Sequence, residues 1–236
     1  MIPGITPIAA SRAKGPIAVT QVSSSTSTAN QTVYTFSSLS LGAESDFPAE
    51  RAIVVATGGI AVTSGAIASS ATIGGVSANK VVEAAETFDN ASLWVANVPA
   101  GTSGDVVVTF SATMNSPYCV VYRMVGMESI AAHDTASDIT VSSNAVSASI
   151  DCPADGVIIG TAWFRWGSSA SASSASWSNL TEDIDGNIEA NARNYSAAHD
   201  EFATQQTARV ITATGSGSGG NQDGKLALAS WSPAPR

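Results

Sequence analysis

Acid–base and nucleophilic chemistry would depend first on the two histidines, His133 and His199. Each is followed by an aspartate, Asp134 or Asp200, but adjacent side chains in a strand point to opposite faces, so neither pair is good evidence for a catalytic dyad. The nearest approach to a nucleophile elbow is the Gly/Ser run 215–219, which lacks the strand–turn–helix setting that such an elbow needs. We therefore expect no Ser-His-Asp enzyme.

An acidic cluster, Asp183, Asp185 and Glu189, offers a second kind of chemistry. Two carboxylates roughly 5–10 Å apart can act as acid and nucleophile in a glycoside hydrolase, so a glycan hydrolase is one alternative hypothesis. A calcium loop is not supported, because the first and last ligand positions around Gly186 are not acidic. We interpret Asp185-Gly186 as a hairpin turn. Four other aspartates are equally well explained as turn formers: Asp134, Asp138, Asp151 and Asp155.

The sequence predicts no site for a cofactor or a metal ion, and we expect the protein to use neither. Gly58-Gly59 and Gly74-Gly75 lack the lysine and the strand–loop–helix setting of a phosphate-binding loop. Cys119 and Cys152 have no cysteine or histidine at metal-ligand spacing. Each lies in an apolar run, which is typical of a buried free thiol. A disulfide between them stays an alternative.

Aromatic side chains could bind a glycan by stacking on its sugar rings. Trp163 and Trp166 fall on opposite faces of one expected strand, and Trp177 lies in a serine-flanked segment. With Tyr195, these three tryptophans are the candidate glycan contacts. The structural alternative is that they pack inside the fold, which is the commoner place for tryptophan in a β-sandwich.

The elements that must position these residues are β-strands. The 236 residues are 44% hydrophobic and only 12% charged, and the charged share is about half that of an average globular domain. Apolar and polar residues alternate in short runs that end at Gly, Pro, Asn or Asp. About a dozen strands favour two stacked sheets, because a single sheet seldom holds so many. The sequence predicts an all-β, two-sheet antiparallel β-sandwich that is jelly-roll-like. The candidate strands are 17–22, 32–36, 52–56, 71–76, 81–87, 92–98, 105–110, 118–125, 146–152, 157–165, 208–213 and 225–231.

Some segments carry more specific signals. Residues 52–56 and 118–125 are apolar on both faces and predict central strands covered from both sides. Apolar residues in 188–202 recur at near-helical spacing, so this window is open between helix and strand, with helix slightly favoured. Residues 168–176 and 215–224 are rich in Ser, Ala, Gly or Asn and are expected to be surface loops.

The N-terminal residues 1–16 are expected to form an extended arm for docking, and residues 17–236 a single sandwich domain. Pro3, Gly4 and Pro7 interrupt the apolar stretch in residues 1–14, which do not resemble a secretory signal. No stretch is long and apolar enough for a membrane-spanning helix, so we expect a soluble protein without membrane insertion. The net charge of −9 and the scattered basic residues argue against nucleic-acid binding. The arm residues expected to contact a partner are Ile2, Pro3, Ile5, Pro7 and Ile8.

An ordered series of segments resembles β-sandwich virion structural proteins of tailed bacteriophages, among them tail-associated, fibre and unassigned structural proteins. The likeness spans residues 34–233 and follows strands and turns rather than a site, so it implies no catalytic residues. The segments are Tyr34-Thr35-Phe36 with Leu41-Gly42, then 51–55, 71–76, 93–96, 99–110, 119–122, Ser176-Trp177 and 227–233.

The resemblance implies a non-enzymatic component of the virion, and we expect a tail-associated or fibre protein that contacts the host surface. Its partners would be other virion proteins, further copies of itself in a closed symmetric oligomer such as a trimer, and a host surface glycan. The alternatives are a capsid decoration or head-fibre protein and, in another class, a carbohydrate-binding module or adhesin.

Overall fold

The structure, a computed structural model, describes residues 15–141, 143–166, 173–188, 192–217 and 221–235. The candidate arm contacts, Ile2 to Ile8, lie outside the described residues. The described chain is all-β and antiparallel, as predicted, with a single turn of 3-10 helix, η1 (Pro48–Glu50). Its strands are β1 (Ala18–Thr26), β2 (Gln31–Ser40), β3 (Arg51–Ala61), β4 (Ala68–Ile73), β5 (Val76–Glu86), β6 (Asp89–Asn97), β7 (Ser103–Val125), β8 (Asp134–Val141), β9 (Ala145–Cys152), β10 (Gly156–Trp166), β11 (Ser173–Ser178), β12 (Thr181–Ile188), β13 (Arg193–Phe202), β14 (Gln206–Gly217) and β15 (Asn221–Trp231).

The strands form three sheets rather than the two that the sequence predicted, and a jelly-roll arrangement is not confirmed. β1 to β7 make the barrel sheet, in which β7–β3–β6–β5–β4 close into a ring because β4 also pairs with β7. The middle sheet has the order β12-β13-β10-β15-β8, and the outer sheet has the order β11-β14-β9. Closing the ring leaves these five strands without a free edge within it.

β7 is the strand that closes the ring. Its first half pairs with β2 and β4, and its second half pairs with β1 and β3. Between the halves, Ser116 has a positive φ of 55° and is followed by Pro117. This bend carries the strand from the outside layer of the barrel to the layer that faces the middle sheet. The sequence predicted two separate strands here, 105–110 and 118–125.

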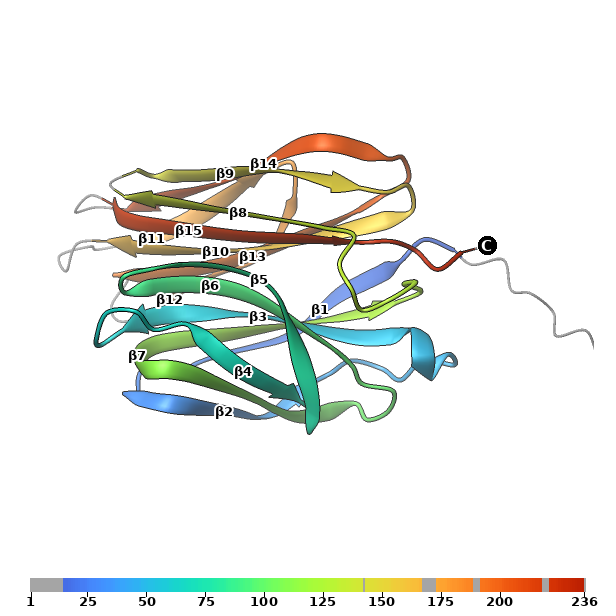
Figure 1. The fold of residues 1–236 in the computed structure, drawn as a ribbon, viewed down its shortest axis with the longest axis horizontal. Coiled ribbons are helices and arrows are strands. Elements are labelled where there is room, and N and C mark those ends of the chain that lie inside the picture. Colours follow the sequence, from blue (N-terminus) through green and yellow to red (C-terminus); the bar gives the residue numbers. More distant parts are fainter. Residues whose placement is uncertain (1–14, 142, 167–172, 189–191, 218–220, 236) are drawn as a thin grey trace, which may run out of the picture.

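Three apolar layers lie between four layers of strands, which Figure 1 shows stacked on one another. One apolar layer fills the barrel, the next joins β1, β3, β6 and β7 to β10, β13 and β15, and the third lies between the middle and outer sheets. Strands of the two inner layers are therefore covered on both faces. Nearly every residue of β3, β6 and β10 is buried. Residues 52–56 of β3 and most of 118–125 in β7 are buried as well, which confirms the prediction for these two segments.

Three local predictions are wrong, and one open choice is resolved. The window 188–202, open between helix and strand, is strand β13 over residues 193–202. Residues 173–176 belong to strand β11 rather than to a surface loop, Asp185-Gly186 lies inside β12 rather than in a turn, and most of 215–224 belongs to β14 and β15. Two glycines explain the last two errors. A Cβ on Gly186 would lie 2.3 Å from the Tyr195 ring, and one on Gly215 would lie 2.9 Å from the Phe164 and Trp166 rings. These glycines make room for aromatic rings within strands rather than forming turns.

Carboxylates fix strand edges by accepting hydrogen bonds from backbone N–H groups, at distances of 2.6–2.8 Å. Asp138 and Asp134 accept from Ser147 and Asp151, so they join β8 of the middle sheet to β9 of the outer sheet. Asp151 in turn accepts from Ala208. Three of the four presumed turn aspartates therefore connect strands, and only Asp155 occupies a turn with positive φ. Other carboxylates that accept from the backbone are Glu44, Glu83, Asp105 and Glu201.

The two ends of the stack differ, and we call them the terminal end and the loop end (Figure 1). At the terminal end, Ile17 N–H donates to Asp155 O and Ala234 N–H donates to Gly126 O. Gly126 also lies beside Ile17, since a Cβ on Gly126 would lie 3.9 Å from Ile17 Cα, so both ends of the described chain lie close together. At the loop end, the connection 62–67 is bonded to β7 near its bend by Val62 N–H to Thr113 O, and to the connection 87–88 by Gly65 N–H to Thr87 O.

Both cysteines are free and fully buried, as the sequence predicted. Burial raises the pKa of Cys152 to about 12 and also raises the pKa of Cys119. Because the thiolate is the reactive form, we expect neither thiol to react with Ellman's reagent in the folded protein at mildly alkaline pH. Both should react in denaturant without added reductant. A thiol that reacts in the native state, or none that reacts after unfolding, would contradict this assignment.

Candidate functional site

A pocket of about 260 Å³ opens at the loop end, where the barrel sheet meets the middle sheet. The β5–β6 turn supplies one side of it, and the ends of β8, β10 and β15 supply the other. Its lining residues come from segments far apart in the sequence: Glu86, Thr87, Phe88, Asp89, Val141, Arg165 and Asp223.

Ion pairs form the floor of this pocket. Arg165 is held between two carboxylates: its Nε lies 3.0 Å from Asp89 Oδ2, and its Nη2 contacts Asp223 Oδ2. The indole N–H of Trp163 donates to Asp89 Oδ1 at 2.9 Å. Asp89 is 2% exposed and Asp223 is 7% exposed, whereas the Arg165 side chain keeps 23% of its surface exposed. A buried carboxylate needs such partners, because removing a charge from water is costly.

Lys225 lies beneath the same pocket and is fully buried. Its Nζ is 3.7 Å from Glu86 Oε2 and 3.8 Å from Asp223 Oδ1, and no hydrogen-bond partner for it is found among the described residues. Burial lowers the pKa of Lys225 and raises the pKa of Asp89, while the attraction of opposite charges opposes both shifts. With Arg193, which also acts on Asp89, three cations balance three carboxylates.

Apolar side chains surround the mouth of the pocket. Phe88 is 37% exposed and Val141 is 61% exposed, and both line the pocket. Val62, Ile67 and Ile139 are further exposed apolar residues in the loop-end half of the molecule. The site therefore combines a floor of charged side chains, balanced overall by neighbouring charges, with an apolar wall.

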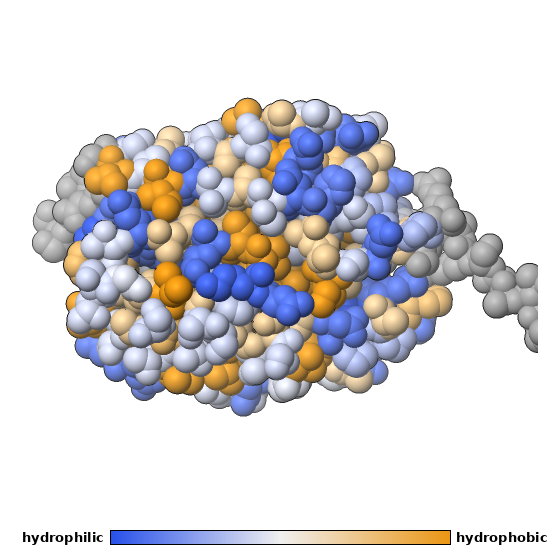
Figure 2. All heavy atoms as spheres, viewed as in Figure 1, coloured by the Kyte–Doolittle hydropathy of each residue, from blue (hydrophilic) through white to orange (hydrophobic). Residues whose placement is uncertain are grey.

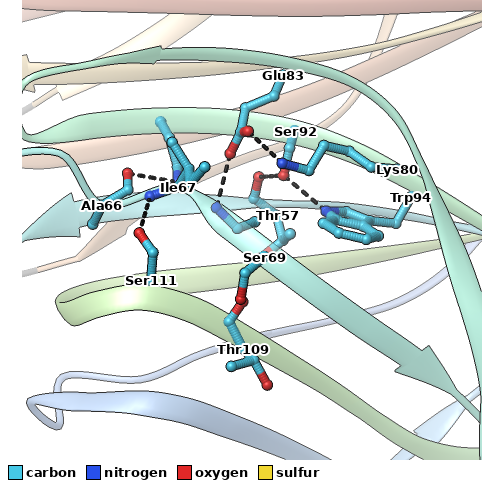
Figure 3. A network of polar contacts seen from close by, with 12 residues as sticks. Thr57, Ala66, Ile67, Ser69, Lys80, Glu83, Ser92, Trp94, Thr109 and Ser111 are labelled. Atoms are coloured by element: carbon cyan, nitrogen blue, oxygen red, sulfur yellow. Dashed lines mark hydrogen bonds and ion pairs between the residues drawn. The ribbon is translucent and has the colours of Figure 1, made fainter.

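A polar network fixes the barrel sheet near the loop end (Figure 3). Glu83 accepts from the N–H of Ala68 at 2.8 Å and from Lys80 Nζ at 2.6 Å, and Lys80 Nζ also lies 5.4 Å from the centre of the Trp94 ring. Ser111 Oγ accepts from the N–H of Ile67 at 3.0 Å. These contacts join the start of β4 to β5, and the connection 62–67 to β7, so the barrel side of the loop end has a fixed shape.

A second hollow of about 420 Å³ lies between β5 and the segment before β8. It is lined by Val81, Val95, Ile130 and Ala132 with a polar rim that includes Asn79 and Ser129. Figure 2, drawn in the same view as Figure 1, shows strongly hydrophobic residues near the middle of the visible face, with hydrophilic residues beside them. Nothing in the structure indicates what would cover this hollow.

The structure pairs His199 with Asp183 rather than with the adjacent Asp200. His199 Nδ1 lies 2.7 Å from Asp183 Oδ2, and the Tyr122 hydroxyl donates to the same oxygen at 2.8 Å. A bulge between Glu182 and Ile184 in β12 places Asp183 here, and Asp200 instead accepts from Thr181. The contact ties the middle sheet to β7 of the barrel sheet.

The other acid–base candidates do not meet. Ser232 Oγ lies 3.3 Å from His133 Nδ1, whereas the Asp134 carboxylate binds backbone N–H groups. Asp185 accepts from Asn194, and Glu189 lies outside the described residues. Within the part of the chain that the structure describes, no hydrogen bonds link either histidine to both a carboxylate and a serine or cysteine, and no group of three or more acidic, histidine or cysteine side chains could hold a metal ion.

All four tyrosines of the chain, Tyr34, Tyr118, Tyr122 and Tyr195, are buried, and burial is the main cause that raises the pKa of each. Their pKa in the unfolded chain is about 10. A pKa raised by folding stabilises the folded state below the unfolded pKa, and this stabilisation is lost as pH rises through the folded pKa. We expect no phenolate absorbance near pH 10 and then a cooperative rise as the protein unfolds. A gradual, reversible titration near pH 10 would contradict this.

The candidate glycan contacts lie mostly in the interior. Trp163 and Trp166 are 0% and 1% exposed, and Tyr195 is 7% exposed. Trp163, Tyr118 and Tyr195 form a stack between the barrel and middle sheets, with ring centres 5.8 and 5.0 Å apart. Trp177 is half-buried and donates to Ser196 Oγ at 2.7 Å. A sugar could reach Trp163, Trp166 or Tyr195 only if the layers of strands separated.

The loop-end pocket was missed from the sequence, although one signal pointed to it. Arg165 and Lys225 stand at the ends of two otherwise apolar strand runs, 157–165 and 225–231, where an unpaired charge would be costly. Two of the partners of these cations, Asp89 and Glu86, could not be named, because they belong to a different sheet.

Comparisons with protein-family models, with curated proteins and with solved structures find no match for this chain. The resemblance to virion proteins therefore stays a prediction. Among the described residues, no helix has the length and apolar character needed to cross a bilayer.

Proposed function

We propose that the protein is a non-enzymatic structural component of a tailed-phage virion, tail-associated or part of a fibre, which contacts the host surface. The observation that supports this role best is the difference between the two ends of the stack. Both ends of the described chain meet at the terminal end, where Phe47 and Val76 are exposed. The loop end carries the larger group of exposed apolar side chains, Val62, Ile67, Phe88, Ile139 and Val141. Such a body can be attached at one end and present the other.

The tightly packed interior makes the protein rigid, which suits a virion component that is used in many copies. Three apolar layers bury nearly all of β3, β6 and β10, and carboxylates fix the strand edges between sheets. A stiff body keeps its exposed end in a fixed orientation, and closed symmetric assembly is the usual form of such repeated parts. The jelly-roll connectivity expected from the sequence is no part of this proposal.

Immunogold electron microscopy tests the proposal. Antibody raised against the purified protein is applied to intact particles and to sections of producing cells, with pre-immune serum as the control. We expect gold on the tails or fibres, a few dozen copies or fewer per particle by quantitative gel staining, and a stable oligomer in analytical ultracentrifugation. Gold on the head with hundreds of copies would favour the capsid-decoration alternative, and gold confined to cytosol would contradict both.

A further inference from the structure

We propose that the loop-end pocket binds one uncharged sugar ring, a hexopyranose of a surface glycan. The inference deepens the proposed function, on which it rests only for the source of the glycan. The pocket's volume of about 260 Å³ is below the roughly 300–1,000 Å³ of pockets that enclose drug-sized ligands, so it fits a single ring.

Charge balance selects an uncharged ligand. The carboxylates of Glu86, Asp89 and Asp223 are matched by Arg165, Lys225 and the nearby Arg193, so the site attracts neither anions nor cations strongly. A hydrogen-bond donor and a hydrogen-bond acceptor nevertheless both line the pocket. The partly exposed Arg165 guanidinium donates and the Glu86 carboxylate, 43% exposed, accepts. Vicinal hydroxyls of a sugar offer an acceptor and a donor side by side.

The wall selects a ligand with one apolar face. Phe88 and Val141 stand at the mouth with 37% and 61% of their surfaces exposed. A pyranose ring presents axial C–H groups on one face and hydroxyls around its edge, so it can stack on Phe88 while its hydroxyls face the charged floor. Simple apolar ligands would leave this floor without partners.

A buried ammonium that has ion-pair partners but no hydrogen bond within the described part of the chain also points to a ligand. Lys225 is fully buried, and its ammonium lies beyond hydrogen-bond distance of Glu86 and Asp223, the two lining carboxylates nearest to it. Unsatisfied buried charges are costly. A hydroxyl that binds Glu86 or Asp223 would let these carboxylates, and through them Lys225, adopt a fully bonded arrangement.

Saturation-transfer NMR on the full chain tests the assignment. The probes are the methyl glycosides of glucose, galactose, mannose and N-acetylglucosamine, with glucuronate and glucosamine as charged comparators. We expect at least one neutral glycoside to bind, with a dissociation constant on the order of 1 mM, more tightly than either charged sugar.

The matched variants are Phe88→Ala and Phe47→Ala. The two side chains are 37% and 39% exposed, but Phe47 lies outside the pocket, in the β2–β3 connection. Phe88→Ala should weaken binding about fivefold with little change in melting temperature, and Phe47→Ala should not change binding. Equal loss in both variants, tighter binding of a charged sugar, or no signal from any probe would overturn the inference. Gold labelling of particles without sugar binding would refute only this site and leave the proposed function standing.

Discussion

Replacing Trp163 by alanine is expected to lower the free energy of unfolding by about 3–5 kcal/mol, as is typical when a large aromatic side chain is removed from a core. Trp163 is fully buried between the barrel and middle sheets, where its ring stacks on Tyr118. Its removal leaves a cavity in the layer that joins the two halves of the molecule. It also takes the indole N–H donor from the buried carboxylate of Asp89.

Urea unfolding followed by circular dichroism measures the change, and Trp163→Phe separates its two causes. The phenylalanine variant keeps most of the stack but lacks the N–H donor, so we expect an intermediate loss of about 1–3 kcal/mol. If Trp163→Ala left stability unchanged and abolished retention on a glycan column, the side chain would be a binding residue, and its place in the core would be wrong.

Arg165→Gln should have an effect of similar size for a different reason. Arg165 is the partner of two buried carboxylates, Asp89 and Asp223, and breaking a buried ion pair typically costs about 3–5 kcal/mol, because the remaining charge is left uncompensated. The partial exposure of the Arg165 side chain places the expected loss at the lower end of this range. Lys80→Gln is the control. It breaks the more exposed pair with Glu83 and should cost about 1 kcal/mol or less.

The loss of unfolding free energy in Arg165→Gln should depend on pH. Burial already raises the pKa of Asp89 in the folded protein, and removing Arg165 raises it further. A carboxyl whose pKa is raised by folding favours the folded state below its unfolded pKa, about 4, and loses that contribution as pH rises through the folded pKa. The difference in stability from the wild type should therefore be smaller at pH 4 than at pH 7. Adding Asp89→Asn should recover part of the loss at pH 7, and a pH-independent loss would argue against this origin.

Period-2 alternation was enough to predict an all-β chain, and the doubly apolar runs 52–56 and 118–125 were enough to predict two of the segments that are covered on both faces. The number of layers was not predictable in the same way. β10 is apolar on both faces because the barrel sheet covers one face and the outer sheet covers the other, but its sequence does not say which strands provide the cover. The sequence also did not predict that β7 is one continuous strand, because Ser116-Pro117 looks like the end of a strand.

Double burial also explains why the sequence left 188–202 open between helix and strand. Alternation is visible only when one face of a strand is wet, whereas Asn194, Ser196 and Ala198 of β13 are as buried as Tyr195 and Ala197. Without polar contrast, chance spacing of apolar residues resembled a helix. The candidate site was harder still to predict, because Trp163 and Asp89 are 74 residues apart and meet only through the packing of two sheets.

The bend in β7 has a mechanical consequence. Its two halves are bonded to four other strands that run lengthwise between the ends of the stack, so tension between those ends pulls bonded strands past one another. In this shear geometry many hydrogen bonds must break together, whereas strands peeled apart sideways release them one at a time. Forced rupture is governed by the unfolding rate rather than by equilibrium stability. The barrel should therefore resist stretching along its long axis far better than its equilibrium free energy of unfolding alone would suggest.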